Sequence, residues 1–395
     1  MKRELLHTPE GVRDIYSEEC ERKLALENGI MSVLRTYGYH PIQTPAFEFF
    51  DIFGKEIGST PSKDLYKFFD REGNTLVLRP DITPSIARCA SKYFMDEKIP
   101  LRFCYTGNTF INNSSYQGRL KECTQSGAEL IGDPSVDADA EMISLAVNLL
   151  KNAGLTDFQI SIGHVDFLEG LLKAAGFDET TEEEIKDFIS NKNFYAVEEL
   201  VKHVSLDPDL IDLFGMLKTF MIQTSHIKEA KEKAKNYEKI YLALERLEQL
   251  DEILKLYQVD QYVSYELAML SGLEYYTGII FSGYTFGTGE AIVKGGRYDT
   301  LLTYFGKNAP ATGFVIVVDQ LMAALSRQNI EIPLANRNIW IVYNCQNQAN
   351  AITIAGKLRK SGENVELMKL TKDTSREMFE AYAENFNIKD VIYCL

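Results

Sequence analysis

The sequence predicts an α+β protein with a large mixed domain, a helical insertion and a small C-terminal α/β domain. Three observations support this. Strands and helices are mixed over the first part of the chain, residues 178–257 are charged and helical in character, and the tail follows a βαβαβ order. With 395 residues, two or three domains are expected. We place the main domain at 1–328, with the insertion at about 178–257, and the tail domain at 336–395.

The main domain begins with a predicted amphipathic helix over 17–37, and Gly38 follows its end. A short strand is predicted over 39–44, and then a hairpin with arms at 65–69 and 75–79. A helix begins after LRPDIT, where Pro84 fits a first-turn position. The remaining elements expected in this domain are strands at 101–111, 123–131, 262–270, 278–286 and 290–295, and helices at 136–153 and 317–327.

The insertion contains segments such as DETTEEEIKD and IKEAKEKAKNYEK, which we interpret as solvated helix faces. A coiled-coil arm is the alternative, but heptads are not sustained. The tail alternates strand and helix, which predicts a small parallel sheet. Its expected elements are strands at 338–343, 364–369 and 390–395, and helices at 347–361 and 374–386.

The overall composition favours a cytoplasmic protein that binds no nucleic acid. The net charge is −15 and the pI is near 5.0, whereas phosphate backbones favour basic surfaces. We find neither an 18-residue apolar run nor the apolar core of a signal peptide, so no membrane association is expected. The six cysteines form no CxxC pair and are interpreted as scattered core thiols, with no metal site.

Three groups of polar side chains stand out as ligand-binding candidates. They are Arg79, Asp81 and Thr83 in LRPDIT; Cys123, Gln125 and Glu129 in CTQSGAE; and Glu274, Tyr275, Tyr276, Arg297 and Tyr298 in SGLEYYTG and KGGRYD. The second group repeats with period two, so one strand face carries a thiol, an amide and a carboxylate. Such groups indicate either an acidic, aromatic pocket for a small cationic or imidazole-bearing ligand, or hydrogen bonds within the core.

Other known motifs are missing from the sequence. The glycine segments do not open a helix directly after a strand, so they predict neither a P-loop nor a dinucleotide site, and no cofactor is expected. His164 and Asp166 are two residues apart, which could suggest an acid–base pair. With no nucleophile motif nearby, we interpret them as a surface contact at a strand end.

These segments, in their order, resemble histidyl-tRNA synthetase, a class II aminoacyl-tRNA synthetase. The likeness runs over roughly 8–328, with a shorter match in the tail. The segments that carry it are TPEGVRDI, YGYHPIQTPAFE (motif 1), LRPDITPSIAR, LRFCYTGNTF…QGRLKECTQSGAELIG (motif 2), SGLEYYTG, GGRYD and TGFVIVVDQL (motif 3). The resemblance implies a six-stranded antiparallel sheet flanked by helices, and a dimer formed through motif 1.

The histidine pocket of that family is largely retained. Residue by residue, the resemblance implies that Asp81, Thr83 and Gln125 face the α-ammonium group, and that Glu129, Tyr276 and Tyr298 surround the imidazole. A carboxylate facing one ring nitrogen fixes the ring's orientation. The histidine-binding set that we predict is Asp81, Thr83, Gln125, Glu129, Tyr275, Tyr276, Arg297 and Tyr298.

The ATP site of the family is not retained. The positions at which the resemblance implies loss are Ile111, Asn113, Cys123, Ser271 and Gln320, of which the first and the last two stand where the family has arginines. Each preorganised donor typically lowers a barrier by about 3–4 kcal/mol, so three correspond to roughly 9–12 kcal/mol if additive. Arg119 cannot replace three separate cations. With the arginines gone, Arg119, Ser271 or a backbone amide remain as candidates for the ligand's carboxylate.

A synthetase-like chain without adenylation chemistry resembles the regulatory subunits of ATP phosphoribosyltransferase, the first enzyme of histidine biosynthesis. The resemblance implies a non-catalytic chain that a short catalytic subunit needs for activity, and that makes the complex sensitive to L-histidine. It also implies a homodimer within a hetero-oligomer, of which the family suggests a hetero-octamer. The alternatives are an active histidyl-tRNA synthetase and a tRNA sensor, but the acidic charge and short tail argue against tRNA.

Overall fold

The computed structural model describes residues 6–54, 60–113, 120–219, 224–270, 272–273, 275–334, 338–386 and 388–395. The chain divides into two compact units, Met1–Ile332 and Pro333–Leu395. In the described residues no helix is both long and apolar enough to cross a membrane.

The first unit is built on a large mixed sheet. Its described strands pair in the order β1-β5-β6-β11-β10-β9-β7-β8. The six central strands pair antiparallel, and the edge pairs β1–β5 and β7–β8 are parallel. This confirms the α+β class and the antiparallel sheet that the resemblance implies. The strands are β1 (His40–Pro41), β5 (Leu101–Phe110), β6 (Glu122–Ile131), β7 (Phe158–His164), β8 (Val263–Tyr265), β9 (Ile279–Thr285), β10 (Val293–Arg297) and β11 (Ala311–Val317).

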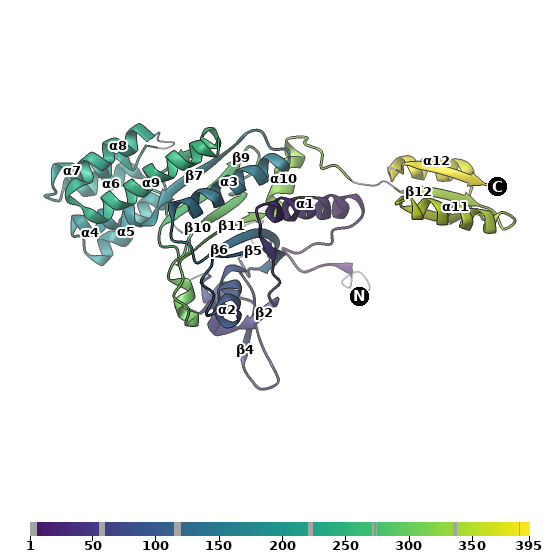
Figure 1. The fold of residues 1–395 in the computed structure, drawn as a ribbon, viewed down its shortest axis with the longest axis horizontal. Helices are drawn as coiled ribbons and strands as arrows, with labels where there is room; N and C mark the ends of the chain where they lie inside the picture. The colour runs from purple at the N-terminus through teal and green to yellow at the C-terminus, as the bar shows by residue number, and fades with distance from the viewer. Residues whose placement is uncertain are drawn as a thin grey trace. The chain divides into compact units, whose positions relative to one another are not determined.

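Three helices, α1 (Ser17–Thr36), α3 (Val136–Asn152) and α10 (Val318–Arg327), cover one face of this sheet (Figure 1). The residues at the ends of two of these helices have the roles expected of helix caps. The side chain of Ser135 caps α3 by accepting from the Ala138 N–H, and Gly38 takes a positive φ of 81° where α1 ends. The opposite face packs against α2 (Thr83–Tyr93), which has its predicted proline in the first turn.

A small second sheet, in the order β2-β4-β3, lies on the same side as α2 (Figure 1). Its strands are β2 (Phe47–Phe49), β3 (Lys67–Phe69) and β4 (Thr75–Leu78). The predicted hairpin is confirmed as the antiparallel pair β3–β4. Its turn is held by the Asp70 carboxylate, which accepts from the backbone N–H and the side-chain amide of Asn74, each at 2.8 Å.

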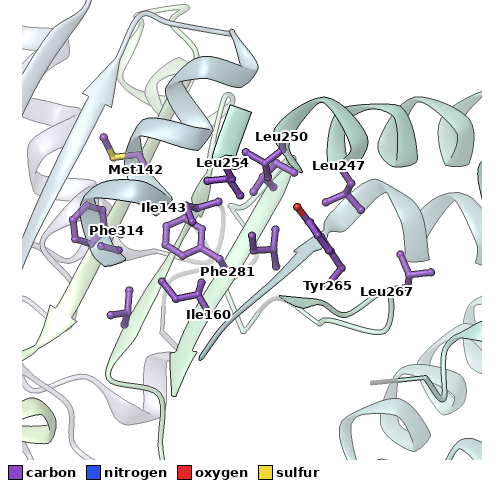
Figure 2. Close-up of a cluster of buried hydrophobic side chains, with 14 of the residues drawn as sticks. Met142, Ile143, Ile160, Leu247, Leu250, Leu254, Tyr265, Leu267, Phe281 and Phe314 are labelled. Carbon is purple, nitrogen blue, oxygen red and sulfur yellow. The ribbon is translucent and has the colours of Figure 1, made fainter. Parts of the chain in front are cut away.

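A group of helices connects β7 to β8. They are α4 (Val165–Ala175), α5 (Glu179–Ser190), α6 (Phe194–Lys202), α7 (Pro208–Met216), α8 (Thr224–Lys233) and α9 (Glu238–Leu256). Figure 2 shows how this group joins the core: Leu250 and Leu254 of α9 lie beside Ile143 of α3 and above Ile160 and Phe281 of the sheet. All of these side chains belong to one buried cluster, so the helices and the sheet share one core. Burying each such side chain contributes about 1.5–3 kcal/mol.

The second unit is a small α/β domain. Its strands β12 (Ile339–Tyr343), β13 (Val365–Lys369) and β14 (Asp390–Cys394) form a parallel sheet in the order β13-β12-β14. Helices α11 (Gln348–Lys360) and α12 (Arg376–Asn385) connect them, as the βαβαβ pattern predicts. Ala351 and Ala355 of α11 pack on Ile341 of the central strand.

Two predicted strands are shorter than expected. The one predicted over 262–270 ends at Tyr265, because the backbone turns and the Met269 N–H donates to the Glu266 carbonyl. The one predicted over 39–44 pairs only at His40 and Pro41. Beyond β8 the apolar residues continue from Leu267 to Leu270, so the sequence pattern alone does not show where that strand ends.

Candidate ligand-binding site

The face of the large sheet that packs toward α2 contains a cavity of about 310 Å³. Alternate residues of a strand share a face, and the strands β6, β9, β10 and β11 each contribute such residues here. The cavity-facing residues of these strands are Gln125, Glu129, Ile280, Ser282, Lys294, Tyr298, Gly313 and Val315. The segment before α2 adds Asp81 and Thr83, and the segment before β9 adds Tyr275 and Tyr276. Seven of the eight predicted histidine-binding residues therefore line one cavity.

Glu129 is the centre of the cavity's polar network. Its side chain is only 1% exposed and accepts hydrogen bonds from Thr83 at 2.7 Å and from the hydroxyl groups of Tyr105 and Tyr298. Burial raises the pKa of Glu129 to about 8, and these hydrogen bonds oppose that rise. This carboxyl is therefore mostly neutral at pH 7.

A second carboxyl, Asp81, lies beside Glu129. It accepts from the Tyr275 hydroxyl at 2.8 Å and from the Thr83 N–H at 3.2 Å. Burial raises the pKa of Asp81 as well. Neither carboxyl forms an ion pair with any residue that the structure describes. Two desolvated carboxyls without a cation are the arrangement that a positively charged or N–H-bearing ligand would stabilise.

Gln125 supplies an unused acceptor. Its Oε1 atom is buried, and within the described parts of the chain no donor reaches it. A buried amide oxygen without a partner costs about 1–3 kcal/mol. A ligand N–H placed in the cavity would remove that cost.

Glycines on the cavity-facing side of the sheet make room for this network. A Cβ atom on Gly313 would lie 1.8 Å from the Glu129 Oε2 atom, and one on Gly127 would lie 2.7 Å from the Tyr105 hydroxyl oxygen. A Cβ atom on Gly296 would lie 2.8 Å from the ring of Tyr276. Any larger residue at these positions would displace the polar side chains.

Arg297 is a correction to the predicted set. It lies on the opposite face of β10, 2% exposed, where its guanidinium pairs with Asp139 of α3 at 2.8 Å and with Asp299 at 3.1 Å. It also donates to the carbonyls of Asp133 and Ser135. Because Tyr298 points into the cavity, its neighbour Arg297 must point away, and it fastens α3 to the sheet instead.

The residues at which the resemblance implies loss of the ATP site lie in different parts of the structure. Ile111 lines the cavity with an apolar side chain, and Gln320 lies in α10 beside Asp319, which pairs with Lys23 at 2.9 Å. Burial raises the pKa of the Cys123 thiol to about 11, and the Oδ1 atom of Asn113 is buried without a described partner. Ser271 and Arg119, the two candidates for the ligand's carboxylate, lie outside the described residues.

His164 is a structural residue, although it is buried rather than at the surface as predicted. Its Nδ1 atom accepts from the Asp166 N–H at 3.2 Å and caps α4, so it is no acid–base pair. Burial lowers the pKa of His164 to about 4, which keeps the ring neutral. All six cysteines are unpaired, and two of them, Cys104 and Cys394, are buried.

Two residues, one that contacts Glu129 and one that lines the cavity, escaped the sequence analysis. Tyr105 donates to Glu129 from β5, and Lys294 lines the cavity from β10. A period-two count would have indicated Lys294, which precedes Gly296 and Tyr298 on the same face. Nothing in the sequence distinguishes Tyr105 from an ordinary core aromatic residue.

Comparisons with known proteins agree with this geometry. Residues 11–321 match the family model of histidyl-tRNA synthetase. The chain is 38% identical over 393 residues to the ATP phosphoribosyltransferase regulatory subunit of Ruminiclostridium cellulolyticum, covering 100% of this chain and 93% of that one. It is 40% identical over 362 residues to the regulatory subunit of Acetivibrio thermocellus, covering 92% and 86%. The chain belongs to the family of ATP phosphoribosyltransferase regulatory subunits.

A solved structure supports the same assignment. A protein from Bacillus halodurans, described as an ATP phosphoribosyltransferase regulatory subunit/histidyl-tRNA synthetase, matches with a TM-score of 0.86 and 33% identity over 99% of this chain and 98% of that one. The expectation of a regulatory subunit with a synthetase-like fold, rather than a catalyst, is therefore confirmed.

Proposed function

We propose that this regulatory subunit binds L-histidine in the cavity and so controls a short-form ATP phosphoribosyltransferase catalytic subunit. The observation that carries the proposal is the buried Glu129 carboxyl, which three hydroxyl groups hold at the base of a cavity that also contains Asp81. A carboxyl in that position accepts from a ring N–H and fixes the orientation of an imidazole.

The two ends of histidine have matching partners. Asp81 and the unpartnered Gln125 oxygen accept hydrogen bonds from the α-ammonium group, which opposes the effect of burial on the pKa of Asp81 and removes the cost of the orphan acceptor. Tyr276 and Tyr298 enclose the imidazole from the sides. Hydrogen bonds to charged groups contribute about 1.5–3 kcal/mol each, so these contacts would supply a substantial part of the binding energy.

Size and charge favour an amino acid over a nucleotide. Ligand pockets commonly measure roughly 300–1,000 Å³, and this one of about 310 Å³ is at the small end of the range. Among the described lining residues Lys294 is the one cation, and the same cavity contains two carboxyls. A triphosphate needs several fixed positive charges, so ATP is a poor ligand for this cavity.

Regulation requires that histidine bind one state of the complex more tightly than another. We propose that the catalytic subunit needs this chain for activity, and that histidine bound in the cavity favours an inactive arrangement of the hetero-oligomer. The desolvated carboxyls give a source for the difference in affinity, because histidine stabilises them only in a state in which the cavity is closed around it.

We propose further that the chain forms a homodimer through the motif 1 region. Phe47 and Phe49 of β2 are 51% and 55% exposed, and Phe69 of β3 is 72% exposed. Exposed aromatic side chains on one small sheet are typical of a surface that another chain covers.

The test is a calorimetric titration of the purified chain with L-histidine and, separately, with ATP. The expected result is heat with histidine and none with ATP. The same chain, mixed with the short catalytic subunit, should raise ATP phosphoribosyltransferase activity, and histidine should lower it. Histidine-dependent ATP–pyrophosphate exchange would instead mean an active synthetase, and tight, salt-dependent tRNA binding would mean a tRNA sensor; either would overturn the proposal.

A further inference from the structure

We propose that Lys294 binds the α-carboxylate of the amino acid, so that the cavity accepts only ligands with a free carboxylate. This inference deepens the proposed function and rests on it. It replaces Arg119 and Ser271, the candidates considered from the sequence, with a residue whose position the structure describes.

The first argument is the position of Lys294 in the sheet. It pairs with Ser282 of β9 and with Val315 of β11, and all three line the cavity. It lies on the same face as Tyr298, which follows directly after β10 and is four residues further along the chain, so their Cα atoms are roughly 13 Å apart. One end of the cavity thus has tyrosine, and the other has an ammonium group on a long flexible stem.

The second argument is the separation of charge across the cavity. Lys294 pairs with Val315 of β11, and Val315 pairs with Gly127 of β6. Glu129 lies two residues beyond Gly127 on β6, which is one row of side chains further along the same face. With strands about 4.8 Å apart and rows about 6.7 Å apart, the two Cα atoms are on the order of 12 Å from each other. A zwitterionic amino acid would fit between them, with its N–H groups toward the carboxyls and its carboxylate toward the ammonium.

The third argument is that the ammonium group is available. Lys294 is exposed, and it makes neither an ion pair nor a hydrogen bond with any residue that the structure describes. By contrast, Arg79, the nearest arginine in the sequence to Asp81, is occupied with the carbonyl groups of Thr44 and Asn108. Ile111, which also lines the cavity, offers no charge.

The expected size of the effect follows from the exposure of Lys294. A hydrogen bond between two charged groups contributes more than a neutral one, but solvent screens a pair at the mouth of a cavity. We therefore expect Lys294→Met to weaken histidine binding by about 5- to 30-fold. Lys294→Arg keeps the charge and should restore most of the affinity.

The experiment is calorimetric titration of the full chain with L-histidine and with L-histidinol, in which a hydroxymethyl group replaces the carboxylate. The wild-type chain should prefer histidine. In Lys294→Met, the affinity for histidine should fall to that for histidinol, whereas the affinity for histidinol should not change. Lys369→Met is the matched control, because it removes another exposed strand lysine far along the chain and should alter neither titration.

Three results would overturn the inference. Histidine binding that is unchanged in Lys294→Met would remove Lys294 from the site while leaving the proposed function intact. An equal loss of histidine and histidinol binding would mean that Lys294 acts on the shape of the cavity and not on the carboxylate. A wild-type chain that binds no histidine would overturn the proposed function itself, and this inference with it. Thermal unfolding of each variant verifies that it is folded.

Discussion

Replacing Glu129 by glutamine is the sharpest test of the proposal that the cavity binds histidine. Alanine at this position would leave the hydroxyl groups of Thr83, Tyr105 and Tyr298 without their shared acceptor, and each buried orphan costs about 1–3 kcal/mol. Glutamine keeps the shape and one oxygen acceptor. Because the pKa of Glu129 is raised to about 8, the neutral form is the main one at pH 7, and an amide is a close replacement for it. We therefore expect Glu129→Gln to fold.

Histidine binding should nevertheless weaken, because the amide cannot ionise. A hydrogen bond to a charged group contributes about 1.5–3 kcal/mol, which corresponds to roughly 10- to 150-fold in the dissociation constant. The difference should be clearest at pH 8, where the wild-type carboxyl of the ligand-free protein is about half ionised. At lower pH the wild-type chain must also expel a proton before it binds.

The assay is calorimetric titration with L-histidine at pH 8, together with thermal unfolding of the ligand-free variant. Glu122→Gln is the matched control: it lies at the other end of β6, accepts from the side chain of Asn108 and does not line the cavity, so it should bind as the wild type does. If folded Glu129→Gln bound histidine with unchanged affinity, the carboxyl would have no contact with the ligand and the assignment of the pocket would be wrong.

Three further predictions concern proton linkage, the glycine at the base of the cavity and the buried ion pair. Histidine affinity should fall by up to about tenfold per pH unit from pH 8 to 6, with protons released on binding, and less so in Glu129→Gln; titrations in buffers of different ionisation enthalpy measure this. The pKa of Glu129 is higher in the folded chain than in the unfolded chain, so its contribution to the stability of the ligand-free protein is greatest below about pH 4.5. That contribution declines by on the order of 4 kcal/mol as the pH rises to 8, which denaturant unfolding at each pH would detect. Gly313→Ala would place a Cβ atom 1.8 Å from Glu129 Oε2 and should abolish histidine binding in the titration, whereas Gly356→Ala, a helix glycine with open space around it, should bind normally and gain about 0.5–1 kcal/mol. Arg297→Met leaves Asp139 buried with fewer partners and should destabilise the fold by about 3–5 kcal/mol in denaturant unfolding, while histidine affinity, measured where the variant is folded, stays within about twofold.

Much of the fold was predictable because its signals are local. The helix over 17–37 has a glycine at its end, the hairpin has an Asp70–Asn74 turn, and the tail alternates strand and helix in regular lengths. Each of these depends on residues close together in the chain. Strand ends were less predictable: β8 stops at Tyr265 because of a backbone turn, while the apolar residues continue to Leu270.

Most of the residues that line the cavity could be selected from the sequence, but their geometry could not. Period two on β6 places Gln125 and Glu129 on one face, and that face does line the cavity. The same rule, applied to KGGRYD, would have separated Arg297 from Tyr298 and selected Lys294. The resemblance carried Arg297 into the ligand-binding set as part of a motif, although its contacts with Asp139 show that its position serves packing.

The buried acceptors of the cavity give a physical basis for the proposed response to a ligand. Burial raises the pKa of both Asp81 and Glu129, and the Gln125 oxygen lacks a described donor, so a ligand that donates to these acceptors would relieve a cost of burial. A histidine molecule would supply N–H groups to all three acceptors at once, and any arrangement that opens the cavity would forfeit those bonds. Coupling between a ligand and a partner subunit typically needs only about 1–3 kcal/mol, which is within what one charge-assisted hydrogen bond provides. Cations placed for a nucleotide would neutralise these carboxyls and remove that difference, so the loss of arginines that the resemblance implies would favour regulation.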